Sequence, residues 1–414
     1  MSHLSVSDAQ AIVLRHVQPA AVEAVALECS LGRVLAADIF ANRDLPPWDV
    51  SAMDGYALRS ADLGSLPAIL TVVDDIKAGD LPHKHVGEGE AARIMTGAPV
   101  PPGADAVIRV EDTQALAADR VQVDKAVRCG NDIRPRGEGM TQGQIVLTAG
   151  SEITPGTVGL LATVKAAQVP VYARPRVAIL ATGDELEGLE EPFDPDRIPN
   201  SNSYALMAQC QALGIEPVLL GIARDDRDEL EQYLRRGLQF DVLLVSGGSS
   251  VGVHDHVRPT LEALKVGIHF WRVAMRPGHP LLFGSQENGG IVFGLPGNPV
   301  SSMVCFEEFV LPALRHRMGH PRCFRRTVEA RLAHEVKVRP GRTEFVRVTL
   351  SRDETGSYVA SSTGTQSSGV LRSMAMADGL LVVPATSSGF SAGEMAWVQL
   401  LDGTTYQQQN EFRD

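Results

Sequence analysis

The chain has 414 residues, of which 44% are hydrophobic and 21% are charged, and its formal net charge is −12. This length predicts two to four domains, and the composition excludes whole-chain disorder and collagen-like repeats. The acidic balance argues against a nucleic-acid partner and leaves room only for a local basic site.

The five cysteines are odd in number and far apart, which argues against a disulfide framework or a zinc knuckle and favours a reducing compartment. The first ten residues are polar and lack the pattern of a signal peptide. No run reaches the roughly 18 apolar residues that a membrane span requires. We therefore expect a cytoplasmic protein without a membrane or nucleic-acid partner.

The N-terminal part is predicted to begin with a helix over residues 7–17, where Ser7 and Gln10 fit a capping box. Between residues 45 and 150, short apolar runs alternate with Gly, Pro and Asp clusters, which is typical of a β-rich domain. A second helix, over residues 157–168, is expected to pack against the first. The β-rich segment would then be an insertion.

Residues 176–314 have a different pattern, in which apolar runs alternate with segments of helical periodicity. The continuous apolar runs are those expected of strands buried on both faces, and the alternation predicts a parallel α/β sheet. Strands are expected at 177–180, 217–222, 242–245 and 291–293, with helices at 203–213, at 226–238 and from Pro299 onward. After residue 321 the helical pattern disappears, and short apolar runs predict a small β domain.

These patterns predict a multidomain fold of the α/β plus β class. Its parts would be a parallel α/β sheet domain, a β-rich inserted domain, a mixed helical linker domain and a small C-terminal domain resembling a β-barrel. The expected boundaries are 1–44 with 140–172 for the discontinuous linker domain, 45–139 for the insertion, 173–320 for the α/β domain and 321–414 for the C-terminal domain.

Three loops follow predicted strands of the α/β domain, at the sheet edge where open parallel sheets bind ligands. They are Thr182-Gly183-Asp184-Glu185, Ser246-Gly247-Gly248-Ser249-Ser250-Val251-Gly252 and Gly294-Leu295-Pro296-Gly297-Asn298-Pro299. Each loop alone could be no more than a tight turn between a strand and a helix. Three together, rich in glycines and hydroxyl groups, favour a phosphate-bearing ligand.

Carboxylates gather around these loops. Asp184, Glu185, Asp225 and Asp255 lie in or beside them, and Asp54 lies in the motif Ser51-Ala52-Met53-Asp54-Gly55-Tyr56. Carboxylates beside a phosphate site favour Mg²⁺, because hard oxygen ligands suit this cation. The simpler alternative is helix capping by Asp225 or Asp226. The sequence His254-Asp255-His256 lacks a third ligand and is a weak signal for a transition metal.

In this order, the motifs resemble the molybdopterin molybdenumtransferase family, which comprises bacterial MoeA and the E domains of homologues such as gephyrin. The matching strings cover nearly the whole chain. Besides the loops and the Asp54 motif, they are Arg93-Ile94-Met95-Thr96-Gly97-Ala98-Pro99, Arg134-Pro135-Arg136-Gly137-Glu138, Pro277-Gly278, Pro340-Gly341-Arg342 and Thr363-Gly364-Thr365-Gln366 with Ser368.

The resemblance implies the insertion of molybdate into adenylylated molybdopterin, with release of AMP. It also implies Mg²⁺ and a homodimer of four-domain chains. The active site would lie between the α/β domain of one subunit and the β-rich insertion of the other. A molybdopterin adenylyltransferase and molybdoenzyme-maturation proteins would be further partners.

The resemblance also implies roles for individual residues. Asp54, Thr96, Glu185, Asp225 and Asp255 would be catalytic, and the last three of these would hold the metal. The pterin would be bound by Thr182, Gly183, Asp184, Ser246, Gly247, Gly248, Ser250, Gly252, Pro296, Gly297, Asn298 and Pro299. Molybdate would be bound by Arg276, His279, Ser301, Arg342 and Ser368.

Three motifs depart from the family pattern, at four positions. Arg276 and His279 stand where the family usually has lysines, Gly139 stands where an acidic residue is usual, and Ser249 replaces a common valine. Because an imidazole titrates near neutrality, a charge at His279 would depend on pH. Two alternatives therefore stay open: a molybdopterin adenylyltransferase, which shares the Ser-Gly-Gly loop, and a non-catalytic scaffold that binds the pterin.

Overall fold

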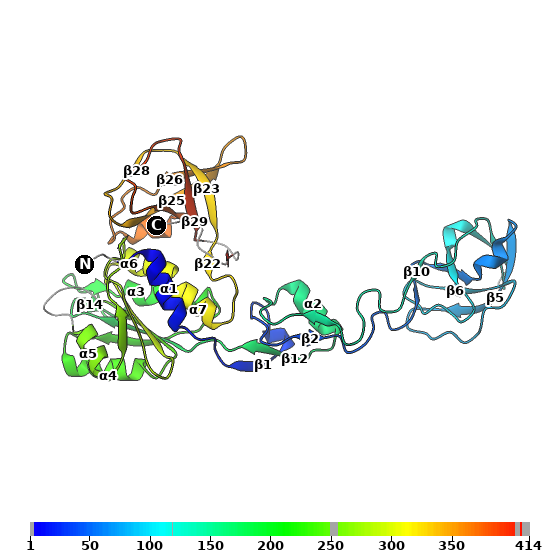
Figure 1. Cartoon of the computed structure of the whole chain (residues 1–414), viewed down its shortest axis with the longest axis horizontal. Coiled ribbons are helices and arrows are strands. Elements are labelled where there is room, and N and C mark those ends of the chain that lie inside the picture. Colours follow the sequence, from blue (N-terminus) through cyan, green and yellow to red (C-terminus); the bar gives the residue numbers. More distant parts are fainter. Residues whose placement is uncertain (1–3, 118, 249–255, 402–405, 408–414) are drawn as a thin grey trace.

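The computed structural model describes residues 4–117, 119–248, 256–401 and 406–407. The molecule is elongated, as Figure 1 shows: the α/β domain and the C-terminal domain lie at one end, the linker domain lies in the middle, and the β-rich domain lies at the other end. Among the described residues, no helix combines the length and the apolar character needed to cross a bilayer.

The α/β domain is built on a six-stranded sheet. Its strands, in spatial order, are β16 (Val218–Ala223), β13 (Val177–Thr182), β17 (Val242–Ser246), β21 (Ile291–Leu295), β20 (Leu282–Ser285) and β18 (Gly267–Phe270). The first four are parallel, whereas β20 is antiparallel to both of its neighbours. The expectation of a parallel sheet is therefore correct for four strands and wrong for β20. A tight turn, closed by a hydrogen bond from the Gln286 amide to the Gly290 carbonyl, leaves no room for a crossover helix before β21.

The central strands are buried along their whole length because helices cover both faces of the sheet. Val177 and Ile179 of β13 point into one core, which they share with α3 (Ser201–Gln211) and α6 (Pro299–Cys305). Ala178 and Leu180 point into the other core, with α4 (Arg227–Gly237) and α5 (Val257–Ala263). The continuous apolar runs in the sequence reflect this two-sided burial.

Helix α1 (Val6–His16) packs on the α/β domain, against α7 (Leu311–Arg317). Its N-cap is Ser5, which accepts a hydrogen bond from the Asp8 amide, so the capping box expected at Ser7 is not the cap. The expectation that the first two predicted helices pack together is also wrong, because α2 (Pro155–Thr163) buries Leu161 in the separate core of the linker domain.

A side chain of α1 donates hydrogen bonds to the neighbouring helix. Helix α6 continues through a π-helical segment (Phe306–Val310) into α7. Pro312 lies in the first turn of α7 and has no amide hydrogen to donate. Gln10 Nε2 donates to the Glu308 carbonyl at 3.0 Å and to the Glu308 carboxylate at 3.2 Å. These two hydrogen bonds explain why the polar side chain of Gln10 is buried on the inner face of α1.

The linker domain pairs residues from before and after the insertion. Strand β1 (Val22–Ala26) is antiparallel to β12 (Gln168–Tyr172), and β2 (Ile39–Phe40) is antiparallel to β11 (Ile145–Leu147). A short 3₁₀-helix (Leu27–Cys29) lies beside α2. The chain therefore leaves this domain and returns to it at neighbouring positions.

The β-rich domain contains a second six-stranded sheet. Its strands, in spatial order, are β7 (Ala106–Arg109), β4 (Gly55–Leu58), β6 (Glu90–Ile94), β5 (Ala68–Ile76), β9 (Arg120–Val123) and β8 (Thr113–Ala117). Apart from the sheet, β3 (Val50–Ser51) pairs with β10 (Ile133–Arg134), and two 3₁₀-helices span Ser60–Leu63 and Val110–Asp112. Alternate residues of β4 enter two cores, one on each face.

The C-terminal domain is a small closed barrel, because β25 pairs with β27 as well as with β26. Its strands are β23 (Thr327–Leu332), β25 (Thr343–Arg352), β26 (Tyr358–Ser362), β27 (Gly379–Val383) and β29 (Met395–Leu400). Short pairs join β22 (Phe324–Arg325) to β30 (Tyr406–Gln407) and β24 (Val336–Lys337) to β28 (Gly389–Phe390), and α8 spans Leu371–Ala375. The barrel confirms the predicted fold class.

Candidate functional site

The three predicted loops meet in one pocket of about 700 Å³. They do so because β13, β17 and β21 are parallel, so their carboxyl ends lie at the same edge of the sheet. Ten predicted residues of these loops line the pocket: Thr182, Gly183, Glu185, Ser246, Gly247, Gly248, Pro296, Gly297, Asn298 and Pro299.

The predicted carboxylates divide into three groups. Asp225 lines the pocket with Glu185, whereas Asp184 accepts a hydrogen bond from the Asp225 amide at 3.1 Å. Asp226 caps α4 by accepting from the Glu229 amide at 2.9 Å, so for this residue the capping alternative is correct. The carboxylate Asp255 lies outside the described residues, as do the predicted pterin-binding residues Ser250 and Gly252.

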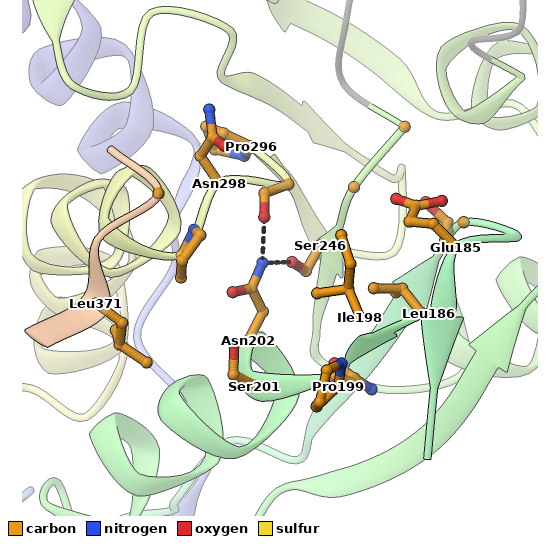
Figure 2. Close-up of a pocket in the computed structure, with 18 of the residues that line it drawn as sticks. Glu185, Leu186, Ile198, Pro199, Ser201, Asn202, Ser246, Pro296, Asn298 and Leu371 are labelled. Carbon is orange, nitrogen blue, oxygen red and sulfur yellow. Dashed lines mark hydrogen bonds between the residues drawn. The ribbon is translucent and has the colours of Figure 1, made fainter. Parts of the chain in front are cut away.

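Asn202 is a residue of the pocket that the sequence did not single out. It lies in the first turn of α3, and its Nδ2 donates to Ser246 Oγ and to the Gly297 carbonyl, each at 2.8 Å. Figure 2 shows both bonds joining the second loop to the third. The polar run Asn200-Ser201-Asn202-Ser203 at the start of a helix was the available signal. Leu371 of the C-terminal domain also lines the pocket.

The second loop requires glycine. Gly247 has φ +97° and Gly248 has φ +61°, in the region that side chains other than glycine rarely occupy. A Cβ atom on Gly247 would lie 2.5 Å from the carbonyl oxygen of Thr182. The backbone of this loop therefore packs directly on the end of β13, and the Gly247 amide donates to the Leu295 carbonyl at 3.1 Å.

The Thr182 side chain has an unsatisfied hydroxyl group. The residue is only 5% exposed, and its Oγ1 has no hydrogen-bond partner within the described part of the chain. A buried polar atom without a partner costs free energy, typically about 1–3 kcal/mol. This oxygen lies beneath the second loop, where a Cβ atom added to Gly247 would be 2.9 Å from it.

The predicted metal ligands fit Mg²⁺ in part. Glu185 and Asp225 present oxygen donors to one pocket, and the Glu185 carboxylate folds back over Gly183, where a Cβ atom would lie 2.4 Å from it. No group of three candidate ligands forms among the described residues. Two carboxylates nevertheless suit Mg²⁺, which keeps several waters and often takes its other ligands from substrate phosphates.

A second, basic pocket of about 420 Å³ lies between the α/β domain and the barrel. We define it by its lining residues Arg276, Arg339, Pro340, Gly341, Arg342 and Glu344. Strand β19 (Met275–Arg276) pairs with β25, which places Arg276 directly opposite Glu344. Two predicted molybdate residues, Arg276 and Arg342, are therefore brought together with Arg339 and Glu344, which the sequence did not suggest.

The other three predicted molybdate residues line neither pocket. His279 contacts the Val273 carbonyl through Nδ1 at 2.6 Å and is partly buried. Ser301 is buried in α6, and the Ser368 carbonyl accepts a hydrogen bond from the Val300 amide at 3.1 Å. Ser301 and Ser368 thus lie near one another at the start of α6.

The remaining two predicted catalytic residues, Asp54 and Thr96, are hydrogen-bonded to each other in the β-rich domain. Asp54 Oδ1 accepts hydrogen bonds from the Thr96 amide and from the Thr96 hydroxyl. These two bonds, the amide bond first, hold the pKa of Asp54 below its ordinary value. Asp54 is therefore an exposed carboxylate held in one orientation. It belongs to the β-rich domain, which lies at the opposite end of the molecule from the α/β domain (Figure 1).

Comparisons with known proteins agree with these features along the chain. Residues 4–164 match the MoeA N-terminal region (domain I and II), residues 178–316 match a probable molybdopterin binding domain, and residues 329–401 match the MoeA C-terminal region (domain IV). The molybdopterin molybdenumtransferase of Staphylococcus aureus (strain MSSA476) is 37% identical over 374 residues, which cover 89% of this chain and 88% of that one.

Two solved structures of the molybdopterin biosynthesis MoeA protein from Pyrococcus horikoshii have the same architecture. One is 31% identical with a TM-score of 0.85, covering 97% of this chain and 100% of that chain. The other is 30% identical with a TM-score of 0.81, covering 96% and 100%. The chain therefore belongs to the molybdopterin molybdenumtransferase family and is an enzyme of molybdenum cofactor biosynthesis.

Proposed function

We propose that the chain inserts molybdate into adenylylated molybdopterin and releases AMP. The pocket at the sheet edge would bind the adenylylated pterin, and the basic pocket would bind molybdate. The observation that carries this proposal is the meeting of three loops, two of them rich in glycine, with Glu185 and Asp225 at one sheet edge.

The residues of this pocket would have different roles in binding the adenylylated pterin. The Gly247 amide donates to the Leu295 carbonyl at 3.1 Å and so would hold the second loop in place. The backbone of Gly248 beside it would approach the phosphate oxygens. The Thr182 hydroxyl, which has no partner among the described residues, would donate to the ligand. Asn202 holds the second and third loops in register and would position them without contacting the reacting atoms.

Glu185 and Asp225, with Asp255, would hold Mg²⁺. When bound, this cation would neutralise charge on the phosphate oxygens of the adenylylated substrate. Glu185 is exposed, so Glu185→Gln should change the free energy of unfolding by less than about 0.5 kcal/mol. AMP release should nevertheless fall by orders of magnitude. A variant that unfolds readily but keeps its turnover per folded molecule would show that the carboxylate is structural.

A product assay tests the reaction itself. Purified protein is incubated with adenylylated molybdopterin and molybdate, and the products are separated by chromatography. Molybdenum cofactor with AMP supports the proposal. Accumulation of adenylylated pterin from molybdopterin and ATP would indicate an adenylyltransferase, and binding without any product would indicate a scaffold.

The active enzyme is proposed to be a homodimer with composite sites. Asp54 and Thr96 belong to the β-rich domain, whereas Glu185 and Asp225 belong to the α/β domain, and these domains lie at opposite ends of the chain (Figure 1). One subunit therefore cannot bring both groups to one substrate in this conformation, but a symmetric partner could.

Subunit mixing tests this arrangement. Asp54→Asn and Glu185→Gln should each be inactive alone. After the two variants are unfolded and refolded together, half of the dimers contain one subunit of each variant. Each of these mixed dimers has one intact composite site. Activity should therefore recover to about one quarter of the wild-type value. No recovery, with mixed dimers demonstrated by mass spectrometry, would place both groups in the same subunit.

A further inference from the structure

We propose that Glu344 couples anion binding in the basic pocket to proton uptake, because an incoming oxyanion must displace its carboxylate from Arg276. This inference rests on the proposed function, in which the basic pocket binds molybdate. It assigns a role in anion binding to a residue that sequence motifs did not suggest.

The geometry places Glu344 as a competitor inside the basic pocket. Arg276 Nη1 lies 3.3 Å from Glu344 Oε1, and the two residues are direct partners where β19 pairs with β25. The Arg276 side chain is 62% exposed, whereas that of Glu344 is 15% exposed. The guanidinium can therefore turn toward a ligand in the pocket, while the carboxylate has little access to water.

The charges around Glu344 come from three elements. Arg276 lies on β19, Arg339 and Arg342 lie in the loop before β25, and the buried Arg347 lies on β25 itself. Arg347 directs its guanidinium donors to the Ser373 hydroxyl and to the carbonyls of Phe345 and Ser367. The pocket therefore contains three arginines that face a ligand and one carboxylate that opposes it.

Burial favours the protonated form of this carboxylate. Desolvation raises the pKa of Glu344 above its ordinary value, and the coulombic effects of Arg276 and Arg347 offset this only in part. A dianion beside the carboxylate, together with the transfer of Arg276 to that dianion, would raise the pKa further. The carboxylate then takes one proton from solvent, and the resulting O–H group can donate to an oxygen of the bound anion.

The direction of the pH effect follows from this proton balance. The complex binds more protons than the empty pocket, so affinity for a dianion rises as pH falls and weakens as pH rises. His279 would produce an effect of the same sign, but its Nδ1 contacts the Val273 carbonyl and it does not line the basic pocket. The two residues are therefore separable by substitution.

The experiment uses calorimetric titration of the full-length protein with sodium molybdate and, separately, with sodium sulfate, which stays a dianion throughout. Titrations are made near pH 6 and pH 8, each in two buffers with different ionisation enthalpies, so that proton uptake is measured directly. The variants are Glu344→Gln, which keeps the shape without the charge, and Arg342→Ala, which removes a pocket cation. Glu335→Gln is the matched control, because this exposed glutamate of the barrel pairs with Lys337 outside the basic pocket.

We expect wild-type protein and Glu335→Gln to bind the anions about tenfold more weakly at pH 8 than at pH 6, with net proton uptake. Glu344→Gln should bind about tenfold more tightly than wild type at pH 8, with a flat pH profile and no proton uptake. Equal pH profiles for wild type and Glu344→Gln, with both proteins folded, would overturn the role of Glu344 while leaving the molybdate site intact. If wild type binds neither anion, or Arg342→Ala binds as well as wild type, the molybdate site itself is wrong and the inference fails with it.

Discussion

Asp54 accepts two hydrogen bonds from a single residue, one from the Thr96 amide at 2.7 Å and one from the Thr96 hydroxyl at 2.9 Å. Both bonds end on the same oxygen, Oδ1, so the second carboxylate oxygen stays available in the exposed turn. This arrangement fixes an ionised carboxylate on the β-rich domain, which suits a group that must meet a substrate bound elsewhere.

Thr96→Val removes the hydroxyl bond and keeps the amide bond. The pKa of Asp54 should rise, yet stay below its ordinary value, because the amide bond is the larger cause of its lowering. The titration of the Asp54 carboxyl, followed by NMR, measures this. Thr71→Val, an exposed substitution on β5 of the same domain, is the control. An unchanged Asp54 titration in Thr96→Val would mean that the hydroxyl bond does not form in solution.

Thr182→Val should separate stability from binding. The variant replaces a buried hydroxyl that has no partner in the described regions with a methyl group, so the protein should be equally stable or up to about 1 kcal/mol more stable. Affinity for the pterin substrate should fall by about tenfold, because the ligand loses a buried hydrogen bond. Thermal unfolding and substrate titration measure the two effects. Thr182→Ser keeps the hydroxyl and should retain binding; equal loss in both variants would point to packing instead.

Two glycines of the pocket should respond differently to alanine. Gly247→Ala places a Cβ atom 2.5 Å from the Thr182 carbonyl at a φ of +97°, so it should destabilise the protein by about 1–3 kcal/mol and weaken substrate binding. At Gly297 the nearest atom to an added Cβ is 3.8 Å away, so Gly297→Ala should stay within about 0.5 kcal/mol of wild type. Calorimetric melting temperatures of the two variants, compared side by side, test the assigned loop conformation. Equal melting temperatures would contradict it.

Acid should weaken the junction between the linker domain and the α/β domain. Arg315 Nη2 lies 3.0 Å from His320 Nδ1, and Glu152 of the linker domain lies 3.7 Å from the same nitrogen. Burial is the main cause that lowers the pKa of His320, and the hydrogen bond to His320 is the main cause that lowers the pKa of Glu152. Because both folded-state values are depressed, both groups bind protons more readily when unfolded.

His320 therefore contributes its full stabilisation above about pH 6.5, and this contribution is lost as the pH falls toward the folded-state pKa of His320. The contribution of Glu152 is lost below about pH 4.5. Urea unfolding at pH 7 and pH 5 should show a loss of about 1 kcal/mol in wild type. His320→Gln should reduce this loss, whereas His334→Gln, at an exposed position of the barrel, should leave it unchanged. A loss of the same size in His320→Gln would exclude this junction as its source.

Local patterns in the sequence were sufficient for the strands and loops of the pocket. The apolar run at 177–180 identified a strand buried on both faces, and the position of the loops after such strands placed Glu185 and Ser246 at one edge. The basic pocket could not be predicted in the same way. It depends on the pairing of β19 with β25, which joins residues nearly seventy positions apart and leaves no periodic signal around Glu344.

The packing of α1 on the α/β domain also could not be predicted from local sequence patterns. The apolar face of this helix fits any complementary surface, and the sequence does not show that Gln10 donates to the Glu308 carbonyl. Asn202 was missed for a related reason. An asparagine in the first turn of a helix is common, and the sequence alone does not show that Ser246 and Gly297 lie beside it.

The point where the β-rich domain joins the chain is closed by a pair of backbone hydrogen bonds. The Leu45 amide donates to the Met140 carbonyl at 2.9 Å, and the Met140 amide donates to the Leu45 carbonyl at 3.3 Å. This is the reciprocal pairing of two opposed residues in an antiparallel hairpin. The whole domain therefore stands where a two-residue turn would suffice, as an oversized hairpin loop. Residues 46–139 are in this sense a module that could be excised and resealed with Asn-Gly, leaving a chain that retains the pocket at the sheet edge and the barrel but carries no Asp54.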